Sequence, residues 1–190
     1  MITVGILALQ GAFLEHVRSL AACGSRTVEV RKAEQLDECQ ALIIPGGEST
    51  TIGKLMDSFG LWNPVRRFAA AGRPIFGTCA GMVLLAKDIE GSEQPRLGLM
   101  DIAIKRNAFG RQVDSFEADI HVPVLGEKPV RGVFIRAPFV TAVGSGVETL
   151  ASFDGKVILV RQGKLLAGAF HPELTTDTRL HQYFLNFLNE

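Results

Sequence analysis

Residues 74–86 of this 190-residue chain read PIFGTCAGMVLLA. The apolar residues 74–76 predict a short strand, and the residues after Gly81 open a helix. Cys79 lies between them, two residues from Gly77 and two from Gly81, as the nucleophile does in the elbow turn of hydrolases. Glycines permit the tight turn that lifts the sulfur to the N-terminus of the helix, where the helix dipole favours a thiolate. The alternative interpretation is a structural cysteine buried among small residues.

The segments on both sides of this turn alternate apolar runs with helical patterns. Further strands are predicted at residues 3–9, 27–31, 41–44, 132–135, 157–161 and 165–170. Helices are predicted from residue 13 to a stop at Gly24, from about Thr51, across residues 64–71, and at residues 178–188. Strand–helix alternation predicts a mostly parallel central sheet with helices on both faces. Because no linker divides the chain, we expect one three-layer α/β domain over residues 1–190.

Composition and charge exclude several classes of function. Lys and Arg together number 20, as do Asp and Glu, so no net charge indicates nucleic acid or an anionic membrane as a partner. No apolar run is long enough to cross a bilayer, and no basic region precedes the apolar N-terminus as in a signal peptide. The three cysteines are odd in number and include no C-x-x-C pair, which argues against a disulfide framework and a zinc site. We therefore expect a cytoplasmic protein without a metal.

A second segment of possible chemistry follows the strand at residues 165–170. His171 and Glu173 flank Pro172, which favours an extended backbone at the residue before it. In an extended segment, residues two apart face the same way, so Glu173 could hold the imidazole in the tautomer that accepts a proton from a thiol. The alternative is an ordinary surface loop that contains a histidine.

A third segment, PGGEST at residues 45–50, follows the strand at residues 41–44. Its glycines could bring backbone N–H groups to a ligand and supply an oxyanion hole. The alternative is a plain turn in which Ser49 caps the next helix. All three segments fall at strand ends, the edge at which open α/β sheets bind ligands.

These segments together carry a resemblance to a known family. The matching motifs are LQG (residues 9–11), PGGESTT (45–51), GTCAG (77–81), RNAFGRQVDSFE (106–117), FIRAP (134–138) and HPEL (171–174). The chain resembles the class I, or triad, glutamine amidotransferases, and among these the glutaminase subunits of pyridoxal 5′-phosphate synthases, which serve vitamin B6 biosynthesis. The resemblance covers essentially the whole chain and implies a flavodoxin-like fold.

The resemblance also implies roles for particular residues. Cys79 is expected to be the nucleophile, His171 the general base and then acid, and Glu173 the residue that orients it. The backbone N–H groups of Gly47 and Ala80 are expected to form the oxyanion hole. The residues expected to hold L-glutamine are Gly47, Glu48, Ser49, Arg106, Ile135 and Arg136. No cofactor is implied, and the ammonia is expected to pass to a separate synthase subunit.

Other interpretations of the chain remain open at this point. It could serve a different acceptor synthase, act as a non-catalytic regulatory module on this fold, or be a cysteine peptidase or esterase. The last conflicts with the α/β-hydrolase order, in which the acid precedes the histidine. Of the other histidines, His16 and His181 fall in predicted helices, and His121 lies in a β-rich stretch with no cysteine or acidic cluster at ligand spacing. We expect surface or hydrogen-bonded residues at all three positions.

Overall fold

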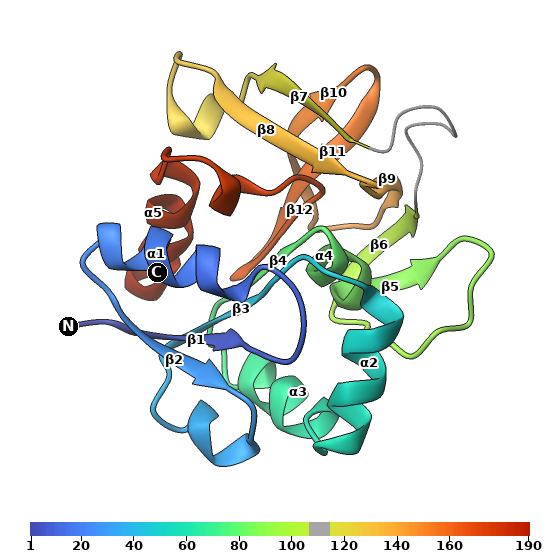
Figure 1. Ribbon diagram of the computed structural model, residues 1–190. Coiled ribbons are helices and arrows are strands. Elements are labelled where there is room, and N and C mark those ends of the chain that lie inside the picture. Colours follow the sequence, from blue (N-terminus) through green and yellow to red (C-terminus); the bar gives the residue numbers. More distant parts are fainter. Residues whose placement is uncertain (107–114) are drawn as a thin grey trace.

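The computed structural model, shown in Figure 1, describes residues 1–106 and 115–190. Residues 107–114, which make up most of the predicted motif 106–117, lie outside the described residues. The helices are α1 (Phe13–Ala22), α2 (Ser49–Ser58), α3 (Trp62–Ala70), α4 (Ala80–Leu85) and α5 (Arg179–Asn186), with short 3-10 helices η1 (Ala33–Leu36), η2 (Pro123–Leu125), η3 (Pro172–Leu174) and η4 (Phe187–Asn189). The strands are β1 (Thr3–Leu7), β2 (Arg26–Val30), β3 (Ala41–Ile44), β4 (Ile75–Thr78), β5 (Ala86–Ile89), β6 (Met100–Lys105), β7 (Ser115–Ile120), β8 (Val130–Ile135), β9 (Phe139–Val143), β10 (Glu148–Phe153), β11 (Lys156–Gln162) and β12 (Leu165–Gly168).

Ten strands form the main sheet. Its order is β2-β1-β3-β4-β12-β11-β9-β6-β5, with β10 beside β11. The five strands from β2 to β12 run parallel, whereas β11 and β9 run antiparallel to their neighbours. Helices α1 and α5 lie on one side of the parallel strands, and α2 and α3 lie on the other (Figure 1). The predicted three-layer α/β fold with a mainly parallel central sheet is confirmed.

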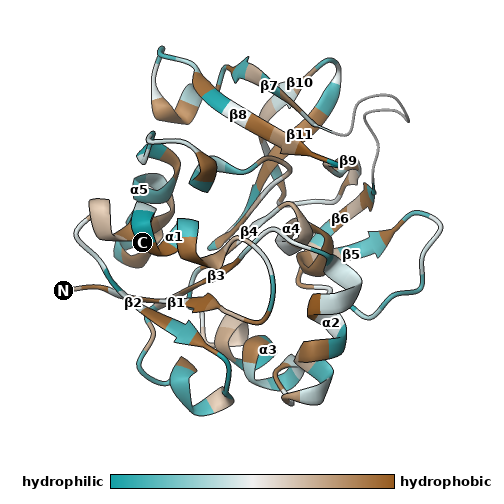
Figure 2. Ribbon diagram, in the orientation of Figure 1, coloured by the Kyte–Doolittle hydropathy of each residue, from teal (hydrophilic) through white to brown (hydrophobic). Residues whose placement is uncertain are grey.

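Burial explains why the central strands are continuous apolar runs. Every residue of β1, β3 and β4 is buried, because helices cover both faces of these strands. Strand β6 instead alternates buried residues with half-buried or exposed ones, as expected where the sheet is covered less completely. Figure 2 shows β1 in brown, whereas teal appears on loops, on α5 and on the strands β2 and β5 at the two ends of the sheet. The core therefore lies on both sides of the strands whose ends carry the site.

The second half of the chain adds a pair of strands that is separate from the main sheet. Strands β7 and β8 pair only with each other among the described strands. The Phe116 and Phe134 rings stack at 4.6 Å, and Phe134 in turn packs against Phe170 beyond the end of β12, at 5.7 Å. The hairpin therefore covers the end of the sheet through aromatic side chains, a contact that the strand pattern alone does not specify.

The boundaries of the predicted elements differ from the structure by a few residues, whereas strands β5, β6, β7, β9 and β10 were not predicted from the sequence. Strand β4 continues through Thr78, and α4 begins at Ala80, so Cys79 alone forms the turn between them. The predicted helix at residues 178–188 consists of α5 and the separate 3-10 turn η4. Within the described residues, no helix is both long and apolar enough to span a membrane.

Candidate active site

Cys79 occupies a strained turn between β4 and α4. Its backbone has φ 48° and ψ −101°, a conformation that L residues rarely adopt and that costs on the order of 1–3 kcal/mol. The Cys79 N–H donates a 2.8 Å hydrogen bond to the carbonyl of Gly168 at the end of β12. The neighbouring strand therefore helps to hold the turn, which presents the sulfur at the first turn of α4.

The two glycines beside this turn are required by close packing. A Cβ on Gly81 would lie 2.1 Å from the carbonyl oxygen of Ile44, and a Cβ on Gly77 would lie 2.6 Å from the Gly81 backbone. Neither glycine has a positive φ; Cys79 itself adopts the left-handed conformation. The elbow prediction is correct in shape, but the glycines let α4 approach the strands rather than supplying the strained torsion.

His171 and Glu173 form a buried pair next to the turn. The His171 Nδ1 atom lies 2.7 Å from Glu173 Oε1, and the His171 N–H donates to the Val133 carbonyl at 2.8 Å. Pro172 begins the 3-10 turn η3, so this segment is not extended as predicted. The turn nevertheless brings the carboxylate to the imidazole, because a tight turn also places residues two apart near one another.

The imidazole of His171 and the carboxylate of Glu173 each stabilise the charged form of the other. Burial by itself lowers the pKa of His171, but hydrogen bonds with Cys79 and Glu173 and their charges raise it to about 10. Burial raises the pKa of Glu173, but the neighbouring His16 and the hydrogen bond with His171 outweigh burial and lower it. At neutral pH, His171 is therefore an imidazolium that faces Cys79 on one side and a carboxylate on the other.

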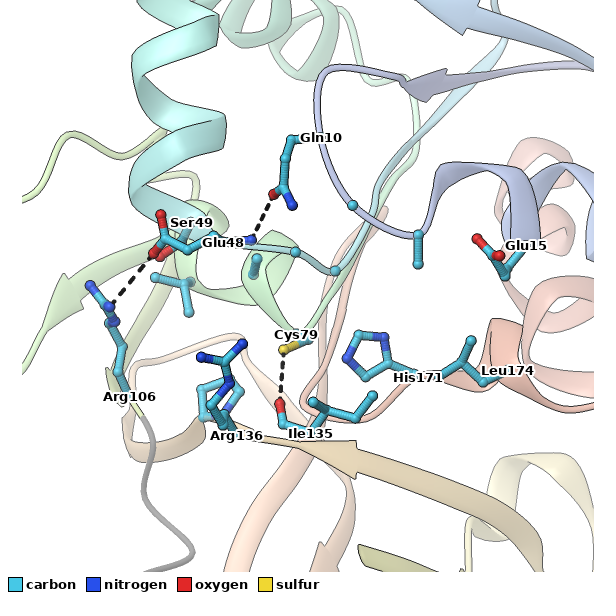
Figure 3. A pocket seen from close by; sticks show the side chains of 17 residues that line it. Gln10, Glu15, Glu48, Ser49, Cys79, Arg106, Ile135, Arg136, His171 and Leu174 are labelled. Atoms are coloured by element: carbon cyan, nitrogen blue, oxygen red, sulfur yellow. Dashed lines mark hydrogen bonds and ion pairs between the residues drawn. The ribbon is translucent and has the colours of Figure 1, made fainter. Parts of the chain in front are cut away.

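A pocket of about 510 Å³ opens above Cys79 (Figure 3). This volume suits a small metabolite. The predicted site residues that line it are Gly47, Glu48, Ser49, Cys79, Ala80, Arg106, Ile135, Arg136 and His171. Glu173 does not line the pocket, because it is buried behind His171. The structure thus brings together ten residues that the sequence scatters over 127 positions, from Gly47 to Glu173.

Glu48 caps helix α2, so the alternative interpretation of this segment, in which Ser49 is the cap, is wrong. The Glu48 carboxylate accepts hydrogen bonds from the backbone N–H groups of Thr50 and Thr51. Burial raises the pKa of this carboxyl, but the hydrogen bonds from the two threonines lower it to about 2. A glutamate can cap here because its longer side chain folds back over the first turn, whereas Ser49 is already helical. Arg106 lies 3.9 Å from Glu48, so opposite charges meet at the pocket wall.

The FIRAP segment supplies another wall of the pocket. Arg136 has φ 43°, an uncommon value for a residue with a side chain, directly after β8. The carbonyl of Ile135 lies 3.8 Å from the Cys79 sulfur, as marked in Figure 3. Cys79 and Arg136 both have unfavourable backbone conformations, and both lie at the same pocket. Such strained residues are common at functional sites.

The Gly46–Gly47 peptide is held against the turn after β1. The Gly46 carbonyl accepts a 3.0 Å hydrogen bond from the Ala12 N–H, and the Gly46 N–H donates to the Thr78 hydroxyl at 3.0 Å. Since the N–H and C=O of a trans peptide point in opposite directions, the Gly47 N–H points away from Ala12. A Cβ on Gly46 would lie 2.2 Å from the His171 ring, so only glycine fits there.

Comparison with known proteins agrees with this geometry. A model of the SNO glutamine amidotransferase family matches residues 6–190. The chain belongs to this family. The pyridoxal 5′-phosphate synthase subunit PdxT of Desulforudis audaxviator (strain MP104C) is 75% identical over 189 residues, which is 100% of both chains. The protein of that name from Pelotomaculum thermopropionicum (strain DSM 13744 / JCM 10971 / SI) is 64% identical over 96% of this chain and 93% of its own.

A solved structure extends the comparison to three dimensions. The crystal structure of a glutamine amidotransferase, 53% identical in sequence, matches with a TM-score of 0.93 over 98% of this chain and 99% of that chain. The resemblance to the class I glutamine amidotransferases is therefore confirmed. In the part of the chain that the structure describes, no group of three or more His, Cys, Asp or Glu residues could hold a metal ion.

Sequence reasoning missed one residue that supports the pocket of this amidotransferase. Gln94 Oε1 accepts a hydrogen bond from Arg106 Nη1 at 2.5 Å and one from the Ser49 hydroxyl at 3.3 Å. It therefore links two predicted substrate-binding residues from outside the pocket. Gln94 lies in a loop between β5 and β6 and belongs to no motif, so the sequence offers no signal for it.

The other histidines divide into two kinds. His121 is exposed, in line with an ordinary surface residue. His16 and His181 are fully buried and contact one another at 3.0 Å, so they are not surface residues. Of the two alternatives expected from the sequence, surface or hydrogen-bonded residues, these two histidines follow the second.

Proposed function

We propose that this chain is the glutaminase subunit of a pyridoxal 5′-phosphate synthase. It hydrolyses L-glutamine to L-glutamate and ammonia, and the ammonia passes to a partner synthase subunit. The observation that carries this proposal is the position of Cys79 at a strained turn, with the His171–Glu173 pair beside it, in a chain that is 75% identical to a protein of that name. The three free thiols support a reducing compartment, and we propose the cytoplasm.

The first half of the reaction forms a thioester. The Cys79 thiolate attacks the side-chain amide carbon of glutamine, and the amide oxygen becomes an oxyanion. The backbone N–H groups of Gly47 and Ala80 donate hydrogen bonds to that oxygen, and the N-terminus of α4 adds a favourable dipole. The His171 imidazolium gives its proton to the leaving nitrogen, so the C–N bond breaks and ammonia departs.

The second half restores the enzyme. Neutral His171 accepts a proton from a water molecule, which attacks the thioester carbonyl. The C–S bond breaks, glutamate leaves with its new carboxylate, and the thiolate and imidazolium face each other again. Glu173 remains ionised throughout and holds the imidazole through the 2.7 Å contact at Nδ1.

Charged groups in the pocket suit the ends of a free amino acid. The guanidinium groups of Arg106 and Arg136 would pair with the α-carboxylate of glutamine, and the carboxylate of Glu48 would attract its α-ammonium. Arg106 is already oriented by Gln94 and by Glu48. A pocket with charges of both signs favours a free amino acid over a glutamine side chain within a peptide.

Covalent labelling with a glutamine-analogue electrophile tests the proposal. In the presence of a synthase subunit, we expect mass spectrometry to locate one label on Cys79, and Cys79→Ala to lose both label and glutamate release. Cys39→Ala is the matched control, because burial raises the pKa of that thiol to about 11 and keeps it unreactive. Turnover by Cys79→Ala close to wild type, or a label on another residue, would refute the assignment.

A further inference from the structure

Behind the triad, helix α1 directs His16 into the core against α5. His16 is fully buried, and its Nε2 atom lies 3.4 Å from Glu173 Oε2 and 3.1 Å from the Thr78 hydroxyl. Its other ring nitrogen, Nδ1, lies 3.0 Å from Nε2 of His181 on α5. His16 therefore contacts the acid of the triad and the last residue of β4, and it does so from the side opposite the pocket.

The surroundings determine which ring nitrogens of His16 and His181 carry protons. Burial lowers the pKa of His16, and burial also lowers that of His181, to about 3, so both rings are neutral near pH 7. Among the described residues, Glu173 Oε2 and His181 Nδ1 are buried atoms without a hydrogen-bond partner. A carboxylate oxygen needs a donor, and Nε2 of His16 is the neighbouring ring nitrogen that could supply one.

Only one tautomer of His16 turns an N–H towards Glu173 and leaves no buried N–H of His181 without an acceptor. With its proton on Nε2, His16 donates to the Thr78 hydroxyl at 3.1 Å and turns the same N–H edge towards Glu173 Oε2 at 3.4 Å, while its Nδ1 accepts from Nε2 of His181. The unpartnered Nδ1 of His181 is then a lone pair. The opposite tautomer would aim a lone pair at the carboxylate and leave a buried N–H of His181 without an acceptor, which is the more costly arrangement.

His16 thereby joins two parts of the site that the pocket keeps apart. Through Glu173, His16 contacts the residue that orients His171. Through the Thr78 hydroxyl, it is connected to the Gly46–Gly47 segment, here called the oxyanion loop, because the same hydroxyl accepts a hydrogen bond from the Gly46 N–H at 3.0 Å. Gly46 in turn lies directly against the His171 ring.

We propose that His16 is a positioning residue of the glutaminase reaction: its Nε2–H holds the second oxygen of Glu173 and, through the Thr78 hydroxyl, the Gly46–Gly47 loop in one geometry. This inference rests on the proposed function. A purely structural role would be served as well by an apolar side chain between α1 and α5, because burying two neutral imidazoles costs free energy unless their hydrogen bonds are made.

Two substitutions at the same position separate the two ring nitrogens. His16→Gln places an amide nitrogen near the position of Nε2 and keeps a donor for Glu173 and Thr78. His16→Asn reaches only to the position of Nδ1 and keeps the contact with His181 alone. With the full chain and a synthase subunit, we expect His16→Asn to lower kcat about 10-fold or more, with KM for glutamine within about twofold, and His16→Gln to retain most of the activity.

The pKa of His171, measured by NMR, provides a readout that a packing role would not move. We expect a lower value in His16→Asn than in His16→Gln, because a poorly held Glu173 stabilises the imidazolium less. The titratable groups that face this pair from the surrounding elements are Cys79 and Glu173 beside His171, and Glu15, Glu173, His171 and His181 around His16. None of the others is changed in either variant.

The outcomes are distinguishable from failure of the proposed function itself. If the wild-type chain with a synthase subunit releases no glutamate, the proposed function fails. If it does, and the Asn and Gln variants share one kcat and one His171 pKa, only the role of His16 is overturned. Should His16→Asn not fold, Thr78→Val keeps the shape while removing the hydroxyl between His16 and Gly46. We expect it to lower kcat without raising KM, and an unchanged kcat would overturn the proposal.

Discussion

Cys79 combines the sulfur that we propose as the nucleophile with an unfavourable backbone conformation. Because φ is 48° at this position, a side chain costs free energy that glycine would not. We predict that Cys79→Gly and Cys79→Ala are both inactive, and that Cys79→Gly is the more stable variant by roughly 1 kcal/mol. Denaturant unfolding of the two variants measures this difference. Equal stability would mean that the turn relaxes once the sulfur is removed.

Two arginines are expected to recognise the carboxylate of the substrate. We predict that Arg106→Ala and Arg136→Ala each lower kcat/KM for glutamine by roughly 10–100-fold, because each removes a charged hydrogen-bond donor. Cys79 should still react with a small uncharged alkylating agent in both variants. Arg131→Ala is the control, since that arginine pairs with Glu117 and Asp119 on the surface of the β7–β8 hairpin. Normal processing of glutamine by both pocket variants would show that these arginines do not bind the substrate.

At the scale of single elements, the Glu48 cap makes the stability of the first turn of α2 depend on pH. The folded pKa of about 2 lies below the ordinary value of 4.5, so the carboxylate stabilises the folded state above about pH 4.5 and loses this effect as the pH falls towards 2. We predict that Glu48→Ala lowers the free energy of unfolding by about 1 kcal/mol at pH 7. The difference from wild type should shrink between pH 4.5 and 2. Glu38→Ala, which breaks only an exposed pair with Arg26, should change stability little at any pH.

Two glycines in helices should respond to alanine in opposite ways. In α4, a Cβ on Gly81 would meet the Ile44 carbonyl at 2.1 Å, whereas in α2 the nearest atom to a Cβ on Gly53 is 3.6 Å away. We predict that Gly81→Ala destabilises the fold and reduces labelling of Cys79, because α4 must move away from β3. Gly53→Ala should stabilise by about 0.5–1 kcal/mol through helix propensity. Thermal unfolding of both variants tests the pair, and a stable Gly81→Ala would contradict the close packing of the elbow.

These elements also show what the sequence can predict. Residues 41–44 match β3, because a strand buried on both faces leaves an uninterrupted apolar run. The three site segments were found because each is a short motif at the end of such a strand. His16 and Gln94 were not, because their partners are Glu173 and Arg106, and no local pattern encodes a contact across the fold. The separate β7–β8 hairpin likewise depends on aromatic packing between distant segments.

At the scale of the whole molecule, the site is open to a partner. Apolar side chains that are 47%, 37% and 42% exposed, those of Leu14, Ile135 and Leu174, lie on three different elements, and the latter two line the pocket. Exposed apolar groups around a pocket mouth favour covering by another protein. A synthase subunit seated there would also keep ammonia from escaping to solvent.

A partner at this position could act on the oxyanion loop. The Gly46–Gly47 peptide is joined to the loop after β1 by the hydrogen bond from Ala12 to the Gly46 carbonyl, and Gln10 accepts from the Glu48 N–H at 2.8 Å. A shift of residues 10–12 on docking would therefore bear directly on this peptide. Because neither glycine has a Cβ, the peptide could flip at little steric cost and reverse the direction of the Gly47 N–H.

We predict on this basis that the isolated chain is nearly inactive and that its synthase partner switches it on. Loss of one oxyanion donor typically lowers kcat by about 10²–10³, enough for the peptide to act as a gate. Since the donor acts mainly on the transition state, the partner should raise kcat far more than it lowers KM. Glutamate release measured with and without the synthase subunit tests this. Equal kcat in the two conditions would exclude the gate, and a change confined to KM would indicate an incomplete substrate pocket instead.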